Sequence, residues 1–523
     1  MPIQNIFMRK NTLLLALVAI LFFNACKKAG NISNDISTNE KEILSTKTID
    51  AFIFSQLQQH NKFEWNTASD EMVWSALQQS DKIMSIGYKP VDETNVESRL
   101  SNINIKDEKW QKAKQQVLQM ILKSESTTRV NLNLNNLEEW KENILPVMDI
   151  KIENLATVKL LRASSLIRYA EPMGYEPHNF EGNEQRTQSS SGCGSNVAEA
   201  NLISGTDFTT ISPNTKQSWN YGYHGISNAW VKSTGSGVKV FIIDTGNEND
   251  QENLNSAFNQ GSSSGRTVEK IVTLPRSTFL GVPTGSVETP DDGCGHGTCM
   301  AGVCAGPRGT DGAACGVAYN CNLVTCRAAA DVYLDESREV KGASDAYTNA
   351  ANRADVKIIS MSMGKMTSSS QLSDAIKYAY GKGKLMFCAA GTSFGWTASW
   401  YGVIFPGWMP EVNAVTGVRD NNFNTNCTDC HKGVETDFTV VMEKATNERH
   451  PLTLAMMGDA PSTVGGSSVA TATTAGMAAL IWSRFPTFTR DQILNKMIQN
   501  SSYYPTRNSN FGWGNVNVDG ATN

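Results

Sequence analysis

The segment VKVFIIDTG, residues 238–246, decides the fold of most of this chain. It is an almost continuous apolar run that ends in an acid and a turn residue, which is typical of a buried strand in a parallel sheet. Similar apolar runs recur at 323–327, 356–361, 385–390 and 412–418, with helical patterns such as 342–354 and 370–381 between them. Strands that alternate with helices predict an α/β fold with a doubly wound, mostly parallel sheet flanked by helices.

Three glycine-rich segments of this region each carry one reactive side chain. Asp244 ends the first strand, His296 lies in GCGHGT, and Ser468 lies in GSSVA. A carboxylate, an imidazole and a hydroxyl are the groups that make a serine nucleophilic at neutral pH. In such a triad the carboxylate orients the imidazole, and the imidazole takes the proton of the serine. A turn aspartate, a structural histidine and a capping serine would explain each residue separately, but together they predict a hydrolase.

The three segments resemble those of the subtilisin-like serine peptidases, the subtilases, in which the triad follows the order Asp, His, Ser. The resemblance runs from about residue 218 to 518 and includes IISMSMG at 358–364, which looks like the substrate-pairing strand of that family. It implies a serine endopeptidase that cleaves proteins or peptides through an acyl-enzyme at Ser468. It also implies a substrate groove lined by Ser362, Met363, Gly364, Ala389, Ala390 and Gly391.

One position departs from the family pattern. The family has an asparagine after the strand FCAAG, where its amide donates to the oxyanion, and this chain has Thr392. A hydroxyl can donate but also accepts, and losing one oxyanion donor costs about 100- to 1000-fold in turnover. Thr392 is therefore the expected oxyanion residue, and the alternative function is a non-catalytic or weakly active peptide-binding relative. The triad needs no cofactor; calcium is common in the family, but no carboxylate cluster here identifies a calcium site.

The N-terminus has the features of an export signal. Arg9 and Lys10 precede an apolar run at 13–23, which is too short for an ordinary membrane span. The run ends in FNAC, which resembles a bacterial lipoprotein cleavage box with Cys26 as the lipidated residue. An ordinary signal peptide with an incidental cysteine is the alternative. We expect a signal peptide at 1–25, a polar tether at 26–46, and an exported protein that is lipid-anchored at the bacterial cell envelope.

Residues 47–176 carry helix and strand patterns of their own. A strand at 146–152 and a helix at 156–161 are followed by a strand at 167–172 that ends in YAEP. This order resembles the second half of a subtilase propeptide. We expect a small α+β domain that acts as an internal inhibitor; an unrelated α+β domain is the alternative. A polar linker is expected at 177–217, followed by the peptidase domain at 218–523. Self-cleavage between about residues 173 and 195 would release that domain from the membrane.

Charge and cysteines limit the other functions. A net charge of −5 argues against nucleic-acid binding. Besides Cys26 the chain has ten cysteines, an even number that predicts disulfides without giving their pairing. The run CTDCH at 427–431 has the form of a c-type haem attachment site. Haem, zinc and a disulfide remain the alternatives for this run, and a disulfide is the simplest.

Overall fold

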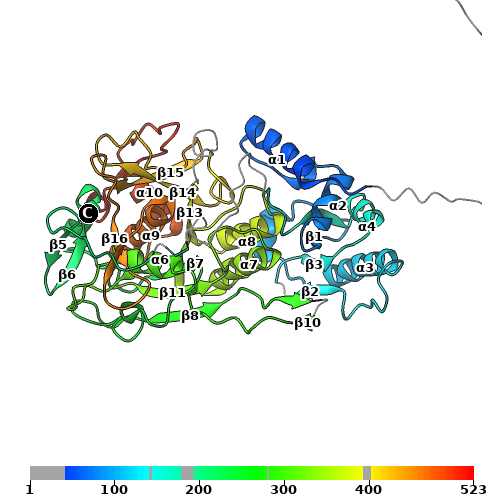
Figure 1. Ribbon diagram of the computed structural model, residues 1–523, viewed down its shortest axis with the longest axis horizontal. Coiled ribbons are helices and arrows are strands. Elements are labelled where there is room, and N and C mark those ends of the chain that lie inside the picture. Colours follow the sequence, from blue (N-terminus) through cyan, green and yellow to red (C-terminus); the bar gives the residue numbers. More distant parts are fainter. Residues whose placement is uncertain (1–41, 141–143, 178–192, 195, 280–281, 393–401) are drawn as a thin grey trace, which may run out of the picture. The chain divides into compact units, whose positions relative to one another are not determined.

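The computed structural model describes residues 42–140, 144–177, 193–194, 196–279, 282–392 and 402–523 (Figure 1). Residues 43–523 form one compact unit. The expected signal peptide, Cys26 and most of the expected cleavage interval lie outside the described residues. None of the helices in the described ranges combines the length and the apolar character that crossing a bilayer requires.

A seven-stranded sheet forms the centre of the C-terminal part, in the order β15-β14-β13-β12-β7-β11-β8. All of its neighbouring strands are parallel. The strands are β7 (Lys239–Asp244), β8 (Val268–Val272), β11 (Asn322–Arg327), β12 (Val356–Met361), β13 (Leu385–Ala389), β14 (Asn413–Arg419) and β15 (Thr436–Glu443). The expected parallel α/β sheet is confirmed. The strand order reverses at β7, and open α/β sheets bind their ligands at the carboxyl ends of strands beside such a reversal.

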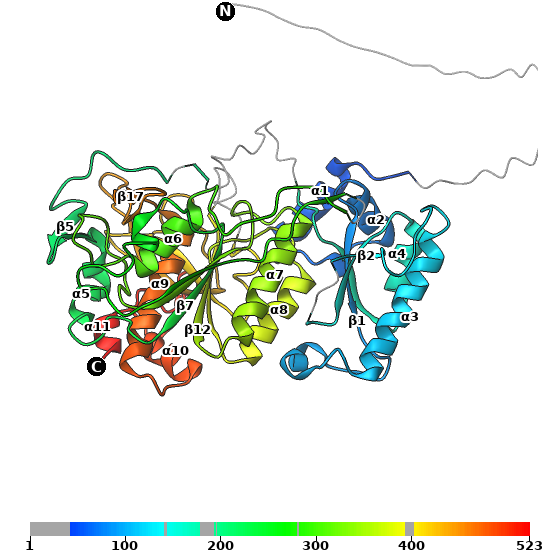
Figure 2. The ribbon, with the colours of Figure 1, turned by 90° about the horizontal axis from the view of Figure 1, so that it is seen from below.

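Helices cover both faces of this sheet, as Figure 2 shows. Helices α6 (His296–Ala305) and α9 (Gly466–Arg484) lie on one face, and α7 (Ser337–Asn352) and α8 (Ser370–Gly381) lie on the other. Strand β7 supplies side chains to both cores: Val240 and Ile242 pack with α6 and α9, whereas Phe241 and Ile243 pack with α7 and α8. Burial on both faces explains why its sequence is almost continuously apolar.

The N-terminal part is a four-stranded antiparallel sheet in the order β2-β3-β1-β4 with helices. Its elements are α1 (Thr46–His60), α2 (Asp70–Gln78), β1 (Ile83–Tyr88), α3 (Glu108–Glu125), β2 (Glu138–Trp140), β3 (Val147–Lys151), α4 (Leu155–Arg162) and β4 (Ile167–Pro172). A small α+β region therefore precedes the seven-stranded sheet, as the sequence predicts. Its sheet lies between α3 and α4 on one side and α7 and α8 on the other (Figure 2), and its apolar core continues into that of α7 and α8.

The expected linker is structured over its second half. Strands β5 (Phe208–Ile211) and β6 (Thr215–Ser218) pair as an antiparallel hairpin, and the amide of Lys216 donates to the carbonyl of Ala313 at 2.9 Å. Because backbone pairing rather than apolar side chains stabilises this hairpin, its polar composition predicted a linker instead of two strands. The other described elements are α5 (Ile226–Ala229), α10 (Arg490–Gln499), α11 (Val518–Ala521), β9 (Thr278–Phe279), β10 (Val282–Pro283), β16 (Leu452–Leu454), β17 (Pro461–Thr463) and 3-10 helices at Trp65–Thr67, Glu97–Asn102, Trp219–His224 and Glu252–Leu254.

Candidate active site

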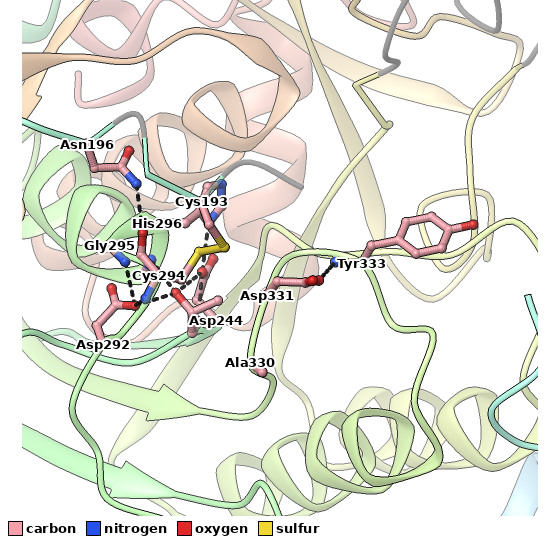
Figure 3. Close-up of a disulfide and its surroundings, with 12 residues drawn as sticks. Cys193, Asn196, Asp244, Asp292, Cys294, Gly295, His296, Ala330, Asp331 and Tyr333 are labelled. Carbon is pink, nitrogen blue, oxygen red and sulfur yellow. Dashed lines mark hydrogen bonds and ion pairs between the residues drawn. A yellow bond between two sulfur atoms is a disulfide. The ribbon is translucent and has the colours of Figure 1, made fainter. Parts of the chain in front are cut away.

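Two of the three expected catalytic side chains are hydrogen-bonded to each other. Asp244 ends β7 and His296 begins α6, and the distance from His296 Nδ1 to Asp244 Oδ1 is 2.7 Å (Figure 3). Burial by itself lowers the pKa of His296, but the charge and hydrogen bond of Asp244, with a contribution from Asp292, outweigh burial and raise that pKa above its usual value. A proton on Nδ1 that faces the carboxylate leaves Nε2 as the basic nitrogen.

A second buried carboxylate, Asp292, shapes the turn before His296. It accepts hydrogen bonds from the amides of Cys294 at 3.1 Å, Gly295 at 2.8 Å and Thr298 at 2.8 Å. The Thr245 hydroxyl also donates to it, at 2.8 Å. A carboxylate at a helix N-terminus satisfies N–H groups that have no partner inside the helix. Sequence reasoning missed Asp292, although an acid shortly before a helix start is a capping signal.

Ser468 lies in the first turn of α9 and is partly exposed. Its hydroxyl donates to the carbonyl of Ser362 at 3.4 Å, and the Ser362 hydroxyl donates to the carbonyl of Ser468 at 3.0 Å. No hydrogen bond joins Ser468 to His296 in the described part of the chain. Catalytic hydrogen bonds are often long without substrate and shorten when it binds. The structure therefore pairs Asp244 with His296 and places Ser468 beside the segment that follows β12.

Thr392 lies beside the residue that precedes Ser468. The amide of Ser467 donates to Thr392 Oγ1 at 3.2 Å, and the two hydroxyl oxygens are 2.9 Å apart. The amide of Gly391 donates to Ser467 Oγ at 3.2 Å. The expected oxyanion residue is thus connected to the start of α9, where free N–H groups and the helix dipole favour an anion.

The expected groove residues differ in what they expose. The side chains of Met363, Ala389 and Ala390 are buried in apolar cores, so at these positions only the backbone is available to a substrate. Ile404 fills the space between the two glycines: an added Cβ would lie 2.5 Å from Ile404 Cδ1 at Gly364 and 3.1 Å from Ile404 Cγ2 at Gly391. Sequence reasoning missed Ile404 because its segment is distant in sequence from both glycines.

A disulfide fixes the chain next to His296. Cys193 bonds to Cys294, two residues before that histidine (Figure 3). The amide of Gly194 and the side-chain amide of Asn196 each donate to the carbonyl of Cys294 at 3.3 Å. The chain that follows the N-terminal part is therefore attached at the candidate active site.

The cysteines of the run CTDCH are joined to each other. Cys427 and Cys430 form a disulfide, so the thiols that covalent haem or zinc would need are joined to each other. The ring of His431 is buried, its Nδ1 lies 2.9 Å from the carbonyl of Gly402, and burial lowers its pKa to about 4.

The even number of cysteines did not indicate complete pairing, because six described cysteines are buried thiols: Cys299, Cys304, Cys315, Cys321, Cys326 and Cys388. Within the described ranges, no three histidine, cysteine or acidic side chains are grouped to hold a metal ion.

Comparisons with known proteins find one family and several relatives that are similar to this chain. A family model described as the subtilase family matches residues 235–514. Subtilisin E of Bacillus subtilis is 28% identical over 289 residues, 55% of this chain and 66% of that protein, so the chain covers slightly less than two thirds of it. A thermostable alkaline protease of Halalkalibacterium halodurans is 30% identical over 232 residues, 44% of this chain and 58% of that protein. The crystal structure of MycP1 from Mycobacterium smegmatis has a TM-score of 0.46 and 19% identity, covering 65% of this chain and 89% of that chain.

Proposed function

Because this chain belongs to the subtilase family of serine peptidases, we propose that it is an exported endopeptidase that forms an acyl-enzyme at Ser468. The observation that carries the proposal is the 2.7 Å hydrogen bond between buried Asp244 and His296. It gives the imidazole the orientation and the basicity that a general base requires.

The proposed reaction uses the described side chains in order. His296 Nε2 takes the proton from Ser468 Oγ, which attacks the carbonyl carbon of the peptide bond. The first-turn amides of α9 and the Thr392 region stabilise the oxyanion. His296 then gives the proton to the leaving amine, and water hydrolyses the acyl-enzyme with His296 again as base. No step requires a cofactor.

The experiment is peptide hydrolysis by the purified protein, measured with and without a serine-directed phosphonate and with and without a chelator. We expect hydrolysis that the phosphonate abolishes and the chelator does not. A folded protein that binds peptides without turnover would instead be the peptide-binding relative. One observation favours this second candidate. Thr392 stands where the family has an asparagine, and its hydroxyl contacts that of Ser467.

We also propose that the N-terminal part is an inhibitory propeptide. Its last described residues contact the segment after Gly364: Lys365 Nζ lies 3.3 Å from Glu176 Oε1 and donates to the carbonyl of Met173 at 3.1 Å. The Tyr333 hydroxyl donates to the same glutamate at 2.6 Å. The chain thus leaves the N-terminal part beside the proposed groove and is next described at Cys193 beside His296, which supports self-cleavage between these points.

Processing is expected to depend on Ser468. Wild type should yield a catalytic fragment whose new N-terminus lies between about residues 173 and 195. This fragment leaves the membrane once it dissociates from the N-terminal fragment, which the lipid on Cys26 keeps there. Ser468→Ala should remain full length and membrane-bound. Fractionation with N-terminal sequencing measures both. If both proteins remain full length and membrane-bound while wild type hydrolyses peptides, the propeptide proposal is wrong.

The Cys193–Cys294 disulfide makes it possible to tell on which side of Cys193 the chain is cut. A cut before Cys193 separates the fragments in denaturant without reductant, whereas a cut after Cys193 leaves them joined until the disulfide is reduced. Electrophoresis with and without reductant distinguishes the two positions.

Ile404 is expected to restrict the substrate residue before the cleaved bond to a small side chain. It occupies the space between Gly364 and Gly391, and Gly364 lies two residues after Ser362, whose carbonyl accepts from Ser468 Oγ. Ile404→Ala should therefore raise kcat/KM for phenylalanine or leucine there, relative to alanine, by about tenfold or more. A peptide series measures this ratio, with Val231→Ala as control because Val231 is 90% exposed. An unchanged ratio would mean that Ile404 does not line the pocket.

A further inference from the structure

The loop CTDCH, residues 427–431, contacts the strand end that carries the proposed oxyanion residue. The amide of His431 donates to the carbonyl of Gly391 at 3.0 Å, and Thr392 forms an antiparallel bridge with Cys430. The loop therefore pairs with the backbone on both sides of the Gly391–Thr392 peptide. This contact connects the CTDCH motif to the candidate active site.

The same strand end is held from its other side by the residue before the nucleophile. The amide of Gly391 donates to Ser467 Oγ, and Thr392 Oγ1 accepts from the amide of Ser467. Gly391 and Thr392 thus lie between the loop and the start of α9. A displacement of the loop would change the position of Thr392 relative to Ser468.

There is little space for such a displacement while the loop is intact. Gly391 has a φ of 119°, and a Cβ at this position would lie 2.7 Å from His431 Nδ1. The imidazole is 3% exposed. The Thr416 hydroxyl donates to the carbonyl of His431 at 2.5 Å, which ties the end of the loop to β14.

The disulfide closes the loop and attaches it to β14. The amide of Cys427 donates to the carbonyl of Gly417 at 3.0 Å, and a Cβ at Gly417 would lie 2.6 Å from Cys427 Sγ. The amide of Cys430 donates to the carbonyl of Cys427 at 3.0 Å. Both cysteines are almost fully buried. The cross-link therefore limits how far Cys430 and His431 can move from the sheet.

We propose that the disulfide-closed loop 427–431 is a positioning element that holds Gly391 and Thr392 in the geometry required to stabilise the oxyanion. The inference rests on the proposed peptidase function. Cys430 and His431 act through Thr392 and do not touch the substrate. Since an oxyanion contact is stronger in the transition state than in the ground state, loosening the loop lowers kcat and leaves KM nearly unchanged.

The test compares Cys427→Ala/Cys430→Ala with wild type in peptide hydrolysis, with each protein produced as the full-length chain and assayed after processing. The expected kcat is lower by at least about tenfold, approaching the ~100-fold loss that removal of one oxyanion donor causes, with KM within about twofold. Cys304→Ala/Cys321→Ala is the matched control: it also removes two buried sulfur atoms, but outside the loop. Its kcat should equal that of wild type.

A double-mutant cycle tests whether the loop affects kcat through the Thr392 hydroxyl. In a Thr392→Val background, which keeps the shape of the side chain but removes its hydroxyl, the loop variant should lower kcat much less than in wild type. Thr416→Val, which removes only the hydrogen bond to His431, is a milder second variant if the double cysteine variant does not fold. It should also lower kcat without changing KM.

Three results would overturn the inference. They are an unchanged kcat in folded loop variants, a change confined to KM, or the same loss of kcat in the Thr392→Val background as in wild type. A wild type that neither hydrolyses peptides nor reacts with the phosphonate would overturn the proposed function itself, and this is distinguishable because it does not depend on any loop variant.

Discussion

Ser468→Ala is expected to lower peptide turnover by about a million-fold, because losing the nucleophile or the base of such a triad leaves only binding and oxyanion contacts. His296→Ala should lower turnover to a similar extent. Asp244→Asn should cost about 10,000-fold, since the carboxylate orients the imidazole without reacting. Initial rates at saturating substrate, corrected for folded protein, measure all three losses.

Ser467→Ala is the control for this prediction. Its hydroxyl contacts Gly391 and Thr392, so its removal should disturb oxyanion contacts and cost about 100-fold at most. If Ser468→Ala retained as much activity as Ser467→Ala, the nucleophile would have been assigned to the wrong serine.

Arg168→Ala is expected to weaken association of the N-terminal and catalytic parts by about 3–5 kcal/mol after processing. Arg168 on β4 forms an ion pair with Asp374 on α8, with Nη2 and Oδ2 2.5 Å apart and both side chains 3% exposed. The hydroxyl of Tyr169 also donates to Asp374, at 3.1 Å. Removing the arginine leaves a buried carboxylate without its cation, which is the costly way to break a buried pair.

Size-exclusion chromatography of processed protein measures this association. Arg168→Ala fragments should separate at concentrations at which wild-type fragments remain together. Lys159→Ala should behave like wild type, because its ion pair with Glu71 lies within the N-terminal part and is more exposed. Equal association of wild type and Arg168→Ala would show that this ion pair does not hold the two parts together.

The sheet could be predicted because its sequence signal is local. Strand β7 is apolar wherever it faces a core, and the end of the run at Asp244 marks the edge where a site is expected. Strand β1 was not predicted, since Ser85 and Gly87 interrupt its apolar pattern although the whole strand is buried. Ser85 is accommodated by a hydrogen bond to Gln371 at 2.7 Å, a contact between distant segments that no local pattern reveals.

The reactive side chains of the candidate site could be predicted one by one from the sequence. Asp244, His296 and Ser468 stand in recognisable segments, and the structure places the first two in contact. The roles of Asp292 and Ile404 depend on which segments fold next to one another, so they became visible only in three dimensions. The same holds for CTDCH, because its contact with Gly391 joins segments that are 40 residues apart in the sequence.

The central claim is that Ser468 is the activated nucleophile. Its most direct test is reaction of purified, folded wild type with a fluorophosphonate, followed by peptide mapping of the modified residue. The account predicts one modified residue, Ser468, and no labelling of Ser468→Ala or His296→Ala. Labelling of another serine, or none in a folded protein that hydrolyses peptides, would contradict the account.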